Sequence, residues 1–221
     1  MDVYTTEQEQ VEMLRKWFKD YAPTIIIGAV LGLGAIYGWR YWQGLQAQKA
    51  EAASAQFETM LTQLADKGKR AEGVKTGDAL TAQYGDTSYA GLTALALAKA
   101  AVEDNKLDEA AKQLRLVVNK PENAMLGHVA RLRLARVLLA QDKKDEALAL
   151  VSDSKLVPGE FLTGYEEVKG DIYAAMGKTA EARTAYQAAQ AAQQQGQGNN
   201  VLLTMKLDQL AAAAPATGAG K

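Results

Sequence analysis

The stretch Leu132–Val151, LRLARVLLAQDKKDEALALV, carries the pattern that decides the fold. Apolar residues recur at helical spacing on both sides of the polar turn QDKKD, which predicts two helices joined by a short connection. Two other stretches align with it: Leu95–Leu114, LALAKAAVEDNKLDEAAKQL, and Glu167–Tyr186, EVKGDIYAAMGKTAEARTAY. The chain therefore contains three similar helical hairpins.

These hairpins share small residues at two fixed positions. The residues are Ala98, Ala135 and Gly170 in the first helix, and Ala110, Ala147 and Ala182 twelve positions later in the second helix. Successive first-helix positions lie 37 and 35 residues apart. A period of about 34 residues with small residues at these places resembles the tetratricopeptide repeat, in which they let helices approach closely. The resemblance implies an all-α solenoid of stacked hairpins.

The flanking segments complete a predicted repeat domain over residues 43–213. Leu45–Tyr84 predicts an additional, atypical hairpin, and Val201–Leu210 predicts a terminal helix that covers the last repeat. Turn residues predict helices of about 12 to 20 residues, and no segment predicts a strand. Residues 214–221 have no apolar periodicity and are expected to be disordered.

A second stretch, Thr24–Gly44, TIIIGAVLGLGAIYGWRYWQG, is far more apolar than the remaining chain. It overlaps 19 consecutive residues without a formal charge between Asp20 and Arg40. As a helix this run would be about 28 Å long, close to a hydrocarbon core of about 30 Å. Pro23 lies at the expected start of the helix, where a missing N–H is tolerated. The pattern predicts a transmembrane helix over residues 21–42.

Aromatic and basic residues mark both ends of this span. Such side chains favour the headgroup level of a membrane. They are Trp17 and Tyr21 at one end, and Trp39, Arg40 and Trp42 at the other. Two alternatives are a cleaved signal peptide and a buried core helix. Bulky residues follow the apolar run, and no later segment is apolar enough to surround it, so a retained anchor is the favoured interpretation.

The first 20 residues are expected to form a short cytoplasmic tail. Thr6 and Glu9 fit a capping box, and apolar residues follow at helical spacing, which predicts an amphipathic helix on the membrane surface. Three basic residues precede the span and two follow it within twenty residues. This small excess favours a cytoplasmic N-terminus with the repeat domain on the opposite side.

Four glycines of the span are spaced for close contacts between helices. Gly28 and Gly32 lie on one face, and Gly34 and Gly38 lie on a roughly opposite face. Without side chains at these positions, two partner helices could approach closely. Glycine is also common in membrane helices, so the alternative is that these residues have no specific partner.

The composition excludes several classes of function. The 221 residues include no Cys, one His, 25 Lys+Arg and 26 Asp+Glu, for a formal net charge of −1. These numbers remove most zinc, redox and nucleophilic sites and argue against a broad surface for nucleic acid. His128, at the start of a predicted helix, is expected to be a surface or capping residue. The sequence predicts no enzyme activity, no cofactor, no metal site and no nucleic-acid partner.

Stacked hairpins offer the face of their first helices for binding. By analogy with the repeat family, the groove would be lined by Leu92, Leu95, Lys99 and Val102 in one repeat and by Val129, Leu132, Arg136 and Leu139 in the next. Lys99 and Arg136 occupy equivalent positions. A mostly apolar groove with two cations suits an apolar or extended polypeptide segment. The alternative is that these leucines only pack against neighbouring helices.

The complete layout resembles the YfgM family of bacterial inner-membrane proteins. The resemblance covers about Val11 to Leu210 and rests on the span GAVLGLGAIYGWRYW, the lead-in AEAASAQFETML and the repeat LRLARVLLAQDKKDEALALV. It implies an ancillary subunit of the Sec translocon with one membrane helix and a periplasmic tetratricopeptide-like domain. The implied partners are the translocon, a PpiD-like periplasmic chaperone, newly translocated secretory proteins and membrane lipid.

The sequence therefore predicts a non-enzymatic adaptor in the bacterial inner membrane. The alternative is an envelope-assembly or cell-division scaffold that oligomerises through its repeats.

Overall fold

A computed structural model describes residues 7–120, 123–195 and 201–213, and every regular element in these ranges is helical. The chain divides into two compact units, Met1–Ala52 and Ala53–Lys221. Helix α1, Glu7–Ala65, contributes residues to both. The other elements are α2 Arg70–Gln83, α3 Ser88–Glu103, α4 Leu107–Asn119, α5 Ala124–Ala140, α6 Lys144–Val151, the 3-10 turn η1 Gly159–Phe161, α7 Leu162–Ala175, α8 Thr179–Gln195 and α9 Val201–Ala213. The predicted disordered tail, 214–221, lies outside the described residues.

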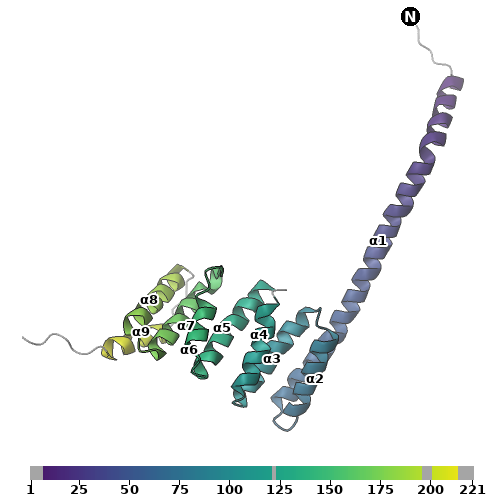
Figure 1. The fold of residues 1–221 in the computed structure, drawn as a ribbon. Coiled ribbons are helices and arrows are strands. Elements are labelled where there is room, and N and C mark those ends of the chain that lie inside the picture. The colour runs from purple at the N-terminus through teal and green to yellow at the C-terminus, as the bar shows by residue number, and fades with distance from the viewer. Residues whose placement is uncertain (1–6, 121–122, 196–200, 214–221) are drawn as a thin grey trace, which may run out of the picture. The chain divides into compact units, whose positions relative to one another are not determined.

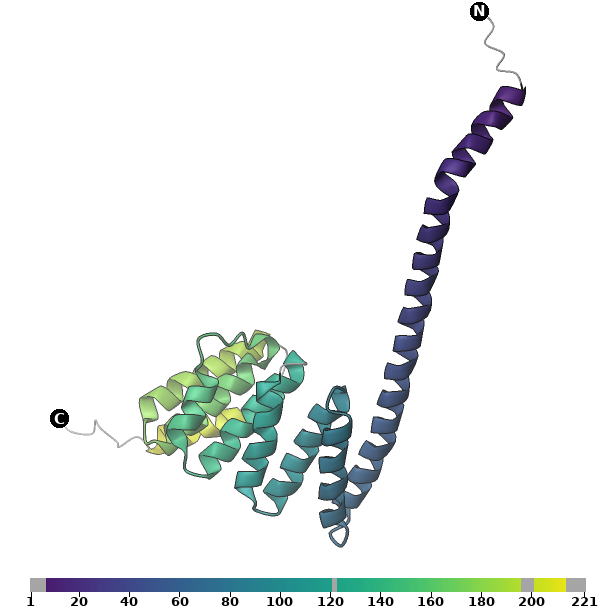
Figure 2. The same ribbon diagram turned by 45° about the vertical axis from the view of Figure 1, so that its right-hand side comes forward.

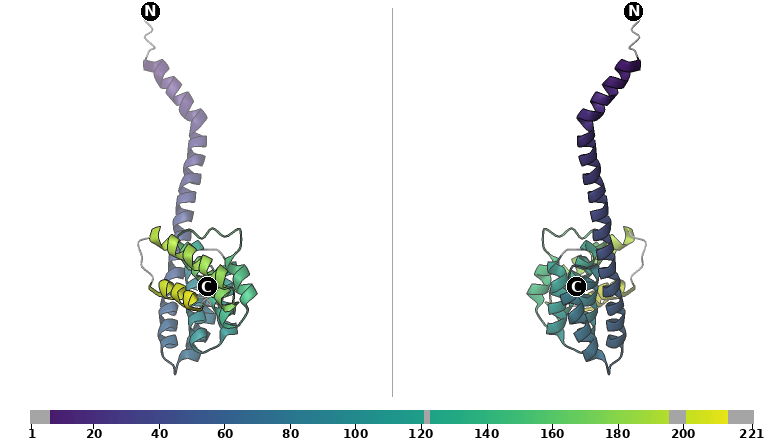
Figure 3. Two further views of the ribbon diagram at one scale, coloured as in Figure 1. Left: turned by 90° about the vertical axis from the view of Figure 1, so that its left-hand side faces the viewer. Right: turned by 90° about the vertical axis from the view of Figure 1, so that its right-hand side faces the viewer.

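The first unit is built from the N-terminal part of α1. This helix continues through Pro23, so the prediction that a helix starts there is wrong. A proline inside a helix removes one backbone hydrogen bond and crowds the preceding turn. Figure 3 shows a bend in the purple N-terminal part of α1. In the described chain, α1 is the one helix long and apolar enough to cross a membrane.

The second unit is a stack of hairpins in chain order. Figures 1 and 2 show α3 beside α4, α5 beside α6, and α7 beside α8, each pair antiparallel. One hydrophobic cluster runs from α3 through α7, and a second joins α7, α8 and α9. The all-α, tetratricopeptide-like architecture predicted from the sequence is confirmed.

Small residues set the helix spacing inside each hairpin. All six predicted packing positions are buried: Ala98, Ala110, Ala135, Ala147, Gly170 and Ala182. The tightest of these is Gly170, where an added Cβ would lie 2.3 Å from Cδ1 of Tyr186. Only glycine leaves room for that ring without a shift of the two helices.

The three hairpin turns share one backbone conformation. Asn105, Asp142 and Gly177 have φ angles of 57°, 61° and 73°. In the first turn the N–H of Lys106 donates to the carbonyl of Ala101 at 2.7 Å, and the other two turns repeat this pattern. Each helix therefore ends in a left-handed residue with a long back-bond, the Schellman arrangement. Asparagine and aspartate tolerate this conformation better than most residues, which explains two turns without glycine.

Helix α6 is shorter than the sequence predicted. It has 8 residues, Lys144–Val151, where about 12 to 20 were expected from the turn signals. Asp153 accepts a hydrogen bond from the N–H of Lys155 at 2.9 Å. This local side-chain bond competes with a further helical turn and ends the element early.

Helix α9 covers the end of the stack, as predicted. In Figure 3 the yellow α9 lies next to the yellow-green α8. Leu203 is buried in the cluster that contains Tyr186. Lys206 Nζ lies 2.7 Å from Glu167 Oε1 and 2.7 Å from Asp171 Oδ1, both on α7. Leu207 and Leu210 pack against the same cluster, so apolar contacts and one polar cluster together fix this helix.

Candidate functional site

The leucines predicted to line the groove have two different environments. Leu95 and Leu132 are 7% and 8% exposed and belong to the hydrophobic core. Leu92 and Val129 are half-buried. Packing between helices therefore accounts for the first pair, as the alternative interpretation stated, and the second pair presents a limited apolar surface.

Charged residues follow directly after the buried small residues of the first helices. They are Lys99, Arg136 and Asp171 at equivalent positions of α3, α5 and α7. The Lys99 side chain is 75% exposed and has a 3.8 Å ion pair with Glu103 of its own helix. Arg136 is exposed and has no ion pair with any described residue. The same repeat position is thus cationic in two hairpins and acidic in the third.

The acidic position is neutralised within the chain. Tyr186 donates a hydrogen bond to Asp171 Oδ1 at 2.8 Å, and Lys206 bonds the same oxygen. Burial raises the pKa of Tyr186, and the hydrogen bond to the carboxylate adds to this effect. Burial alone would lower the pKa of Lys206, but its hydrogen bonds to Asp171 and Glu167 raise it. This group of side chains favours a protonated tyrosine and a charged lysine.

A second cluster neutralises acids at the C-terminal end of α3. Arg70 lies 2.5 Å from Asp104 Oδ1 and 2.8 Å from Glu103 Oε2. The same guanidinium donates through Nε to the carbonyl of Leu64 at 3.2 Å. The hydrogen bond from Arg70 lowers the pKa of Asp104. These carboxylates are therefore already engaged by the chain's own cation.

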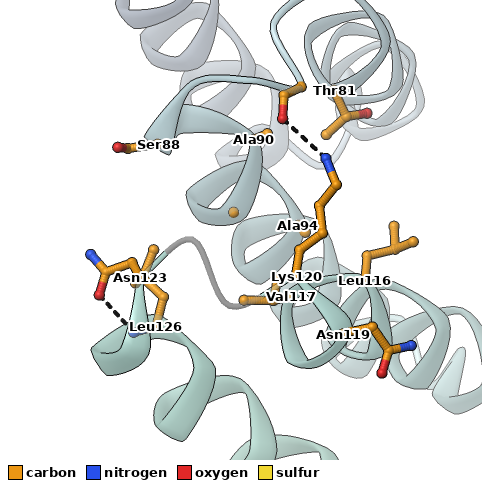
Figure 4. Close-up of a pocket in the computed structure, with 12 residues that line it drawn as sticks. Thr81, Ser88, Ala90, Ala94, Leu116, Val117, Asn119, Lys120, Asn123 and Leu126 are labelled. Carbon is orange, nitrogen blue, oxygen red and sulfur yellow. Dashed lines mark hydrogen bonds between the residues drawn. The ribbon is translucent and has the colours of Figure 1, made fainter.

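A cavity of about 350 Å³ opens between the α2–α3 turn, the end of α4 and the start of α5 (Figure 4). Its walls include the small residues Ala90, Gly91 and Ala94, and Lys120 at its edge donates to the Gly85 carbonyl at 3.3 Å. An apolar cavity of about 150 Å³ can hold benzene, so this one can admit an apolar side chain. None of the groove residues predicted on α3 and α5 lines it. This cavity was not predicted from the sequence, because small residues on a helix equally indicate packing.

His128 is not a surface or capping residue, so that prediction is wrong. It is half-buried, its Nδ1 lies 2.9 Å from the hydroxyl of Tyr165, and its ring stacks on Phe161 with centroids 5.0 Å apart. The cap of α5 is Asn123, whose side chain accepts from the N–H of Met125 at 3.0 Å. Among the described residues, no three His, Asp or Glu side chains could hold a metal ion.

The predicted membrane residues are exposed along α1. Ring centroids lie 5.6 Å apart for Trp17 and Tyr21, and 5.2 Å apart for Trp39 and Trp42. An added Cβ would meet no atom within 4 Å at any of the four glycines, Gly28, Gly32, Gly34 and Gly38. Arg40 is exposed between the two tryptophans. The helix thus has the length, composition and exposed surface of a single membrane span.

Comparisons with known proteins place these features in a family. The family model described as a tetratricopeptide repeat-like domain matches residues 15–212. The ancillary SecYEG translocon subunit of Escherichia coli (strain K12) is 31% identical over 189 residues, which cover 85% of this chain and 89% of the relative.

Two further relatives carry the same name. The protein of Haemophilus influenzae is 30% identical over 209 residues, covering 94% of this chain and 99% of the relative. The protein of Neisseria gonorrhoeae is 26% identical over 210 residues, covering 95% and 100%. No solved structure gives a significant match. The relatives are named as translocon subunits and share a repeat domain of a non-catalytic kind. With its apolar helix, its repeats and these matches, the chain belongs to the YfgM family of ancillary SecYEG translocon subunits.

Proposed function

We propose that this protein is a non-enzymatic, membrane-anchored adaptor of the Sec translocon. The observation that carries the proposal is the alignment with relatives named ancillary SecYEG translocon subunits over 85% and 94% of this chain. The family model matches residues 15–212, which include both the apolar helix and the hairpins. An anchor joined to a binding domain positions that domain beside a membrane complex.

The repeat domain would bind a PpiD-like periplasmic chaperone, emerging secretory polypeptides, or both. The exposed Lys99 and Arg136 and the half-buried Leu92 and Val129 support a polypeptide-binding face on α3 and α5. Stacked hairpins commonly use such extended faces for binding. The cavity beside the α2–α3 turn offers a second place for a partner's apolar side chain.

The membrane helix would contact the translocon through its glycines, with the N-terminus in the cytoplasm. The open space beside all four glycines supports close approach by another helix. Leucine at Gly28 and Gly32 should reduce co-purification of translocon subunits if that face is used. Leucine at Gly34 and Gly38 tests the other face in the same way, and unchanged co-purification of both variants would contradict translocon contacts through the glycines.

Two experiments test the proposal. A periplasm-specific reporter fused after Lys221 should be active, and a cytoplasm-specific reporter at the same place should be inactive. Activity of the cytoplasm-specific reporter would contradict the orientation. Purification in a mild detergent should recover translocon subunits and a periplasmic chaperone. Recovery of division or outer-membrane assembly proteins in their place would contradict the adaptor and favour the scaffold.

A further inference from the structure

We infer that the face of α3 and α5 that carries Lys99, Arg133 and Arg136 binds a segment of a partner polypeptide. That segment carries carboxylates beside apolar residues. The inference rests on the proposed function, because it specifies the chemistry of the polypeptide bound by the repeat domain. The cations concerned are Lys99, Arg133 and Arg136, here named the cationic face.

Helix α5 has an unusual charge distribution. Its sequence, AMLGHVARLRLARVLLA, contains three arginines and no acidic residue. Arg131 donates to the carbonyl of Leu150 at 3.4 Å and is thereby directed toward α6. Arg133 and Arg136 lie one turn apart, are exposed, and have no ion pair with any described residue. Two exposed guanidinium groups, each able to form two parallel hydrogen bonds with a carboxylate, therefore lie one turn apart on α5.

Carboxylates on the neighbouring first helices, α3 and α7, are engaged by other cations of the chain. Glu103 pairs with Arg70 at 2.8 Å. Glu167 and Asp171 both pair with Lys206 at 2.7 Å. Among the described residues, no carboxylate forms an ion pair with Arg133 or Arg136. Charge complementarity then favours an acidic partner, which would associate faster at low salt and bind more weakly as the salt concentration rises.

The third hairpin carries an acidic residue at this repeat position and pairs it with a cation from another helix. Asp171, the equivalent of Lys99 and Arg136, meets Lys206 of α9 while Leu203 of the same helix enters an apolar cluster. An ion pair thus acts together with an apolar contact. The cationic face likewise combines a charge with an apolar side chain, because half-buried Val129 lies one turn before Arg133. Here the charge is positive, so the matching partner group is a carboxylate.

The test is photocrosslinking in cells with the full-length protein. A photoreactive residue replaces Ala140, which is exposed one turn after Arg136, and the crosslinked partner peptide is mapped by mass spectrometry. The variant R133E/R136E should reduce the adduct at least about tenfold. The matched control is R183E, since Arg183 on α8 is also exposed. Unchanged thermal melting of each variant establishes that the fold is intact.

The expected result is a mapped segment with carboxylates, an adduct lost in R133E/R136E, and recovery when those carboxylates are changed to lysine. An adduct that survives charge reversal, or maps to a segment without carboxylates, overturns this inference and leaves the adaptor standing. Absence of adducts from Ala140 and also from Val102 on α3 contradicts polypeptide binding by this face, so this inference falls together with that part of the proposed function.

Discussion

Replacing Gly170 with alanine should destabilise the repeat domain by about 3 kcal/mol. The new Cβ would lie 2.3 Å from both Cδ1 and Cε1 of Tyr186, a side chain that is 3% exposed. Displacing the ring costs about 1–3 kcal/mol as overpacking. It also breaks the 2.8 Å hydrogen bond to Asp171, a charged acceptor worth about 1.5–3 kcal/mol. Alanine returns about 1 kcal/mol through its higher helix propensity.

The assay is thermal unfolding of the full-length protein in detergent, followed by circular dichroism. At about 2–4 °C per kcal/mol for a domain of this size, the melting temperature should fall by about 6–12 °C. Gly127→Ala is the matched control, because its new Cβ meets no atom within 4 Å. That variant should melt at the same temperature as the parent protein or higher.

A second substitution tests whether the contact with the ring causes the loss. The first hairpin has Ala98 and Leu114 at the positions of Gly170 and Tyr186, and both are buried. The double variant G170A/Y186L copies that pair and should be more stable than the sum of the single effects by about 1–3 kcal/mol. Strict additivity, or a G170A protein that melts like the parent, would refute the steric argument.

Three further predictions concern single side chains. Thr93 is fully buried and its hydroxyl has no hydrogen-bond partner among the described residues, so T93V should raise the free energy of unfolding by about 1 kcal/mol. T87V is the opposite control, because the Thr87 hydroxyl donates to a carbonyl at 2.8 Å and its loss should cost about 1 kcal/mol in denaturant titrations. Asp142 and Gly177 both have left-handed backbone conformations, which glycine adopts more easily than other residues. D142G should therefore stabilise the second turn by about 0.5–1 kcal/mol, and G177A should destabilise the third turn by about 1–2 kcal/mol. Equal melting temperatures for the parent protein, D142G and G177A would contradict this prediction. The raised pKa of Tyr186 means that the folded state keeps a proton which the unfolded state loses above about pH 10, so stability should fall as the pH rises beyond that value. Denaturant titrations at several alkaline pH values should show a shallower fall for Y186F, and an identical slope would count against the prediction.

The hairpins and their register could be predicted from sequence because their signal is local and repeated. Ala98, Ala135 and Gly170 recur near one period, and each is buried in the structure. The turns could be located from polar residues, although the shared left-handed conformation at Asn105 and Asp142 could not be read from residue type alone.

Other features depend on contacts between residues far apart in the chain. Lys206 meets Asp171 across 35 positions, and no local pattern marks that pairing. Gly73 was missed although an added Cβ there would lie 2.9 Å from the backbone N of Leu64, because one glycine in a helix has many explanations. The course of α1 through Pro23 was also missed, since proline usually indicates a helix start or end. The groove remains a prediction at its exposed positions.

Helix α9 gives the repeat domain an end that can open. Within residues 201–211, Leu203 is the buried side chain, while Val201 and Met205 face outward. In a stack where each repeat contacts only the repeats beside it, a terminal helix with few buried side chains opens at a lower free energy than the whole domain. Amide exchange and proteolysis should therefore reach α9 first. Opening would release Lys206 from Glu167 and Asp171. The repeat domain would then expose these two carboxylates in addition to its cationic face.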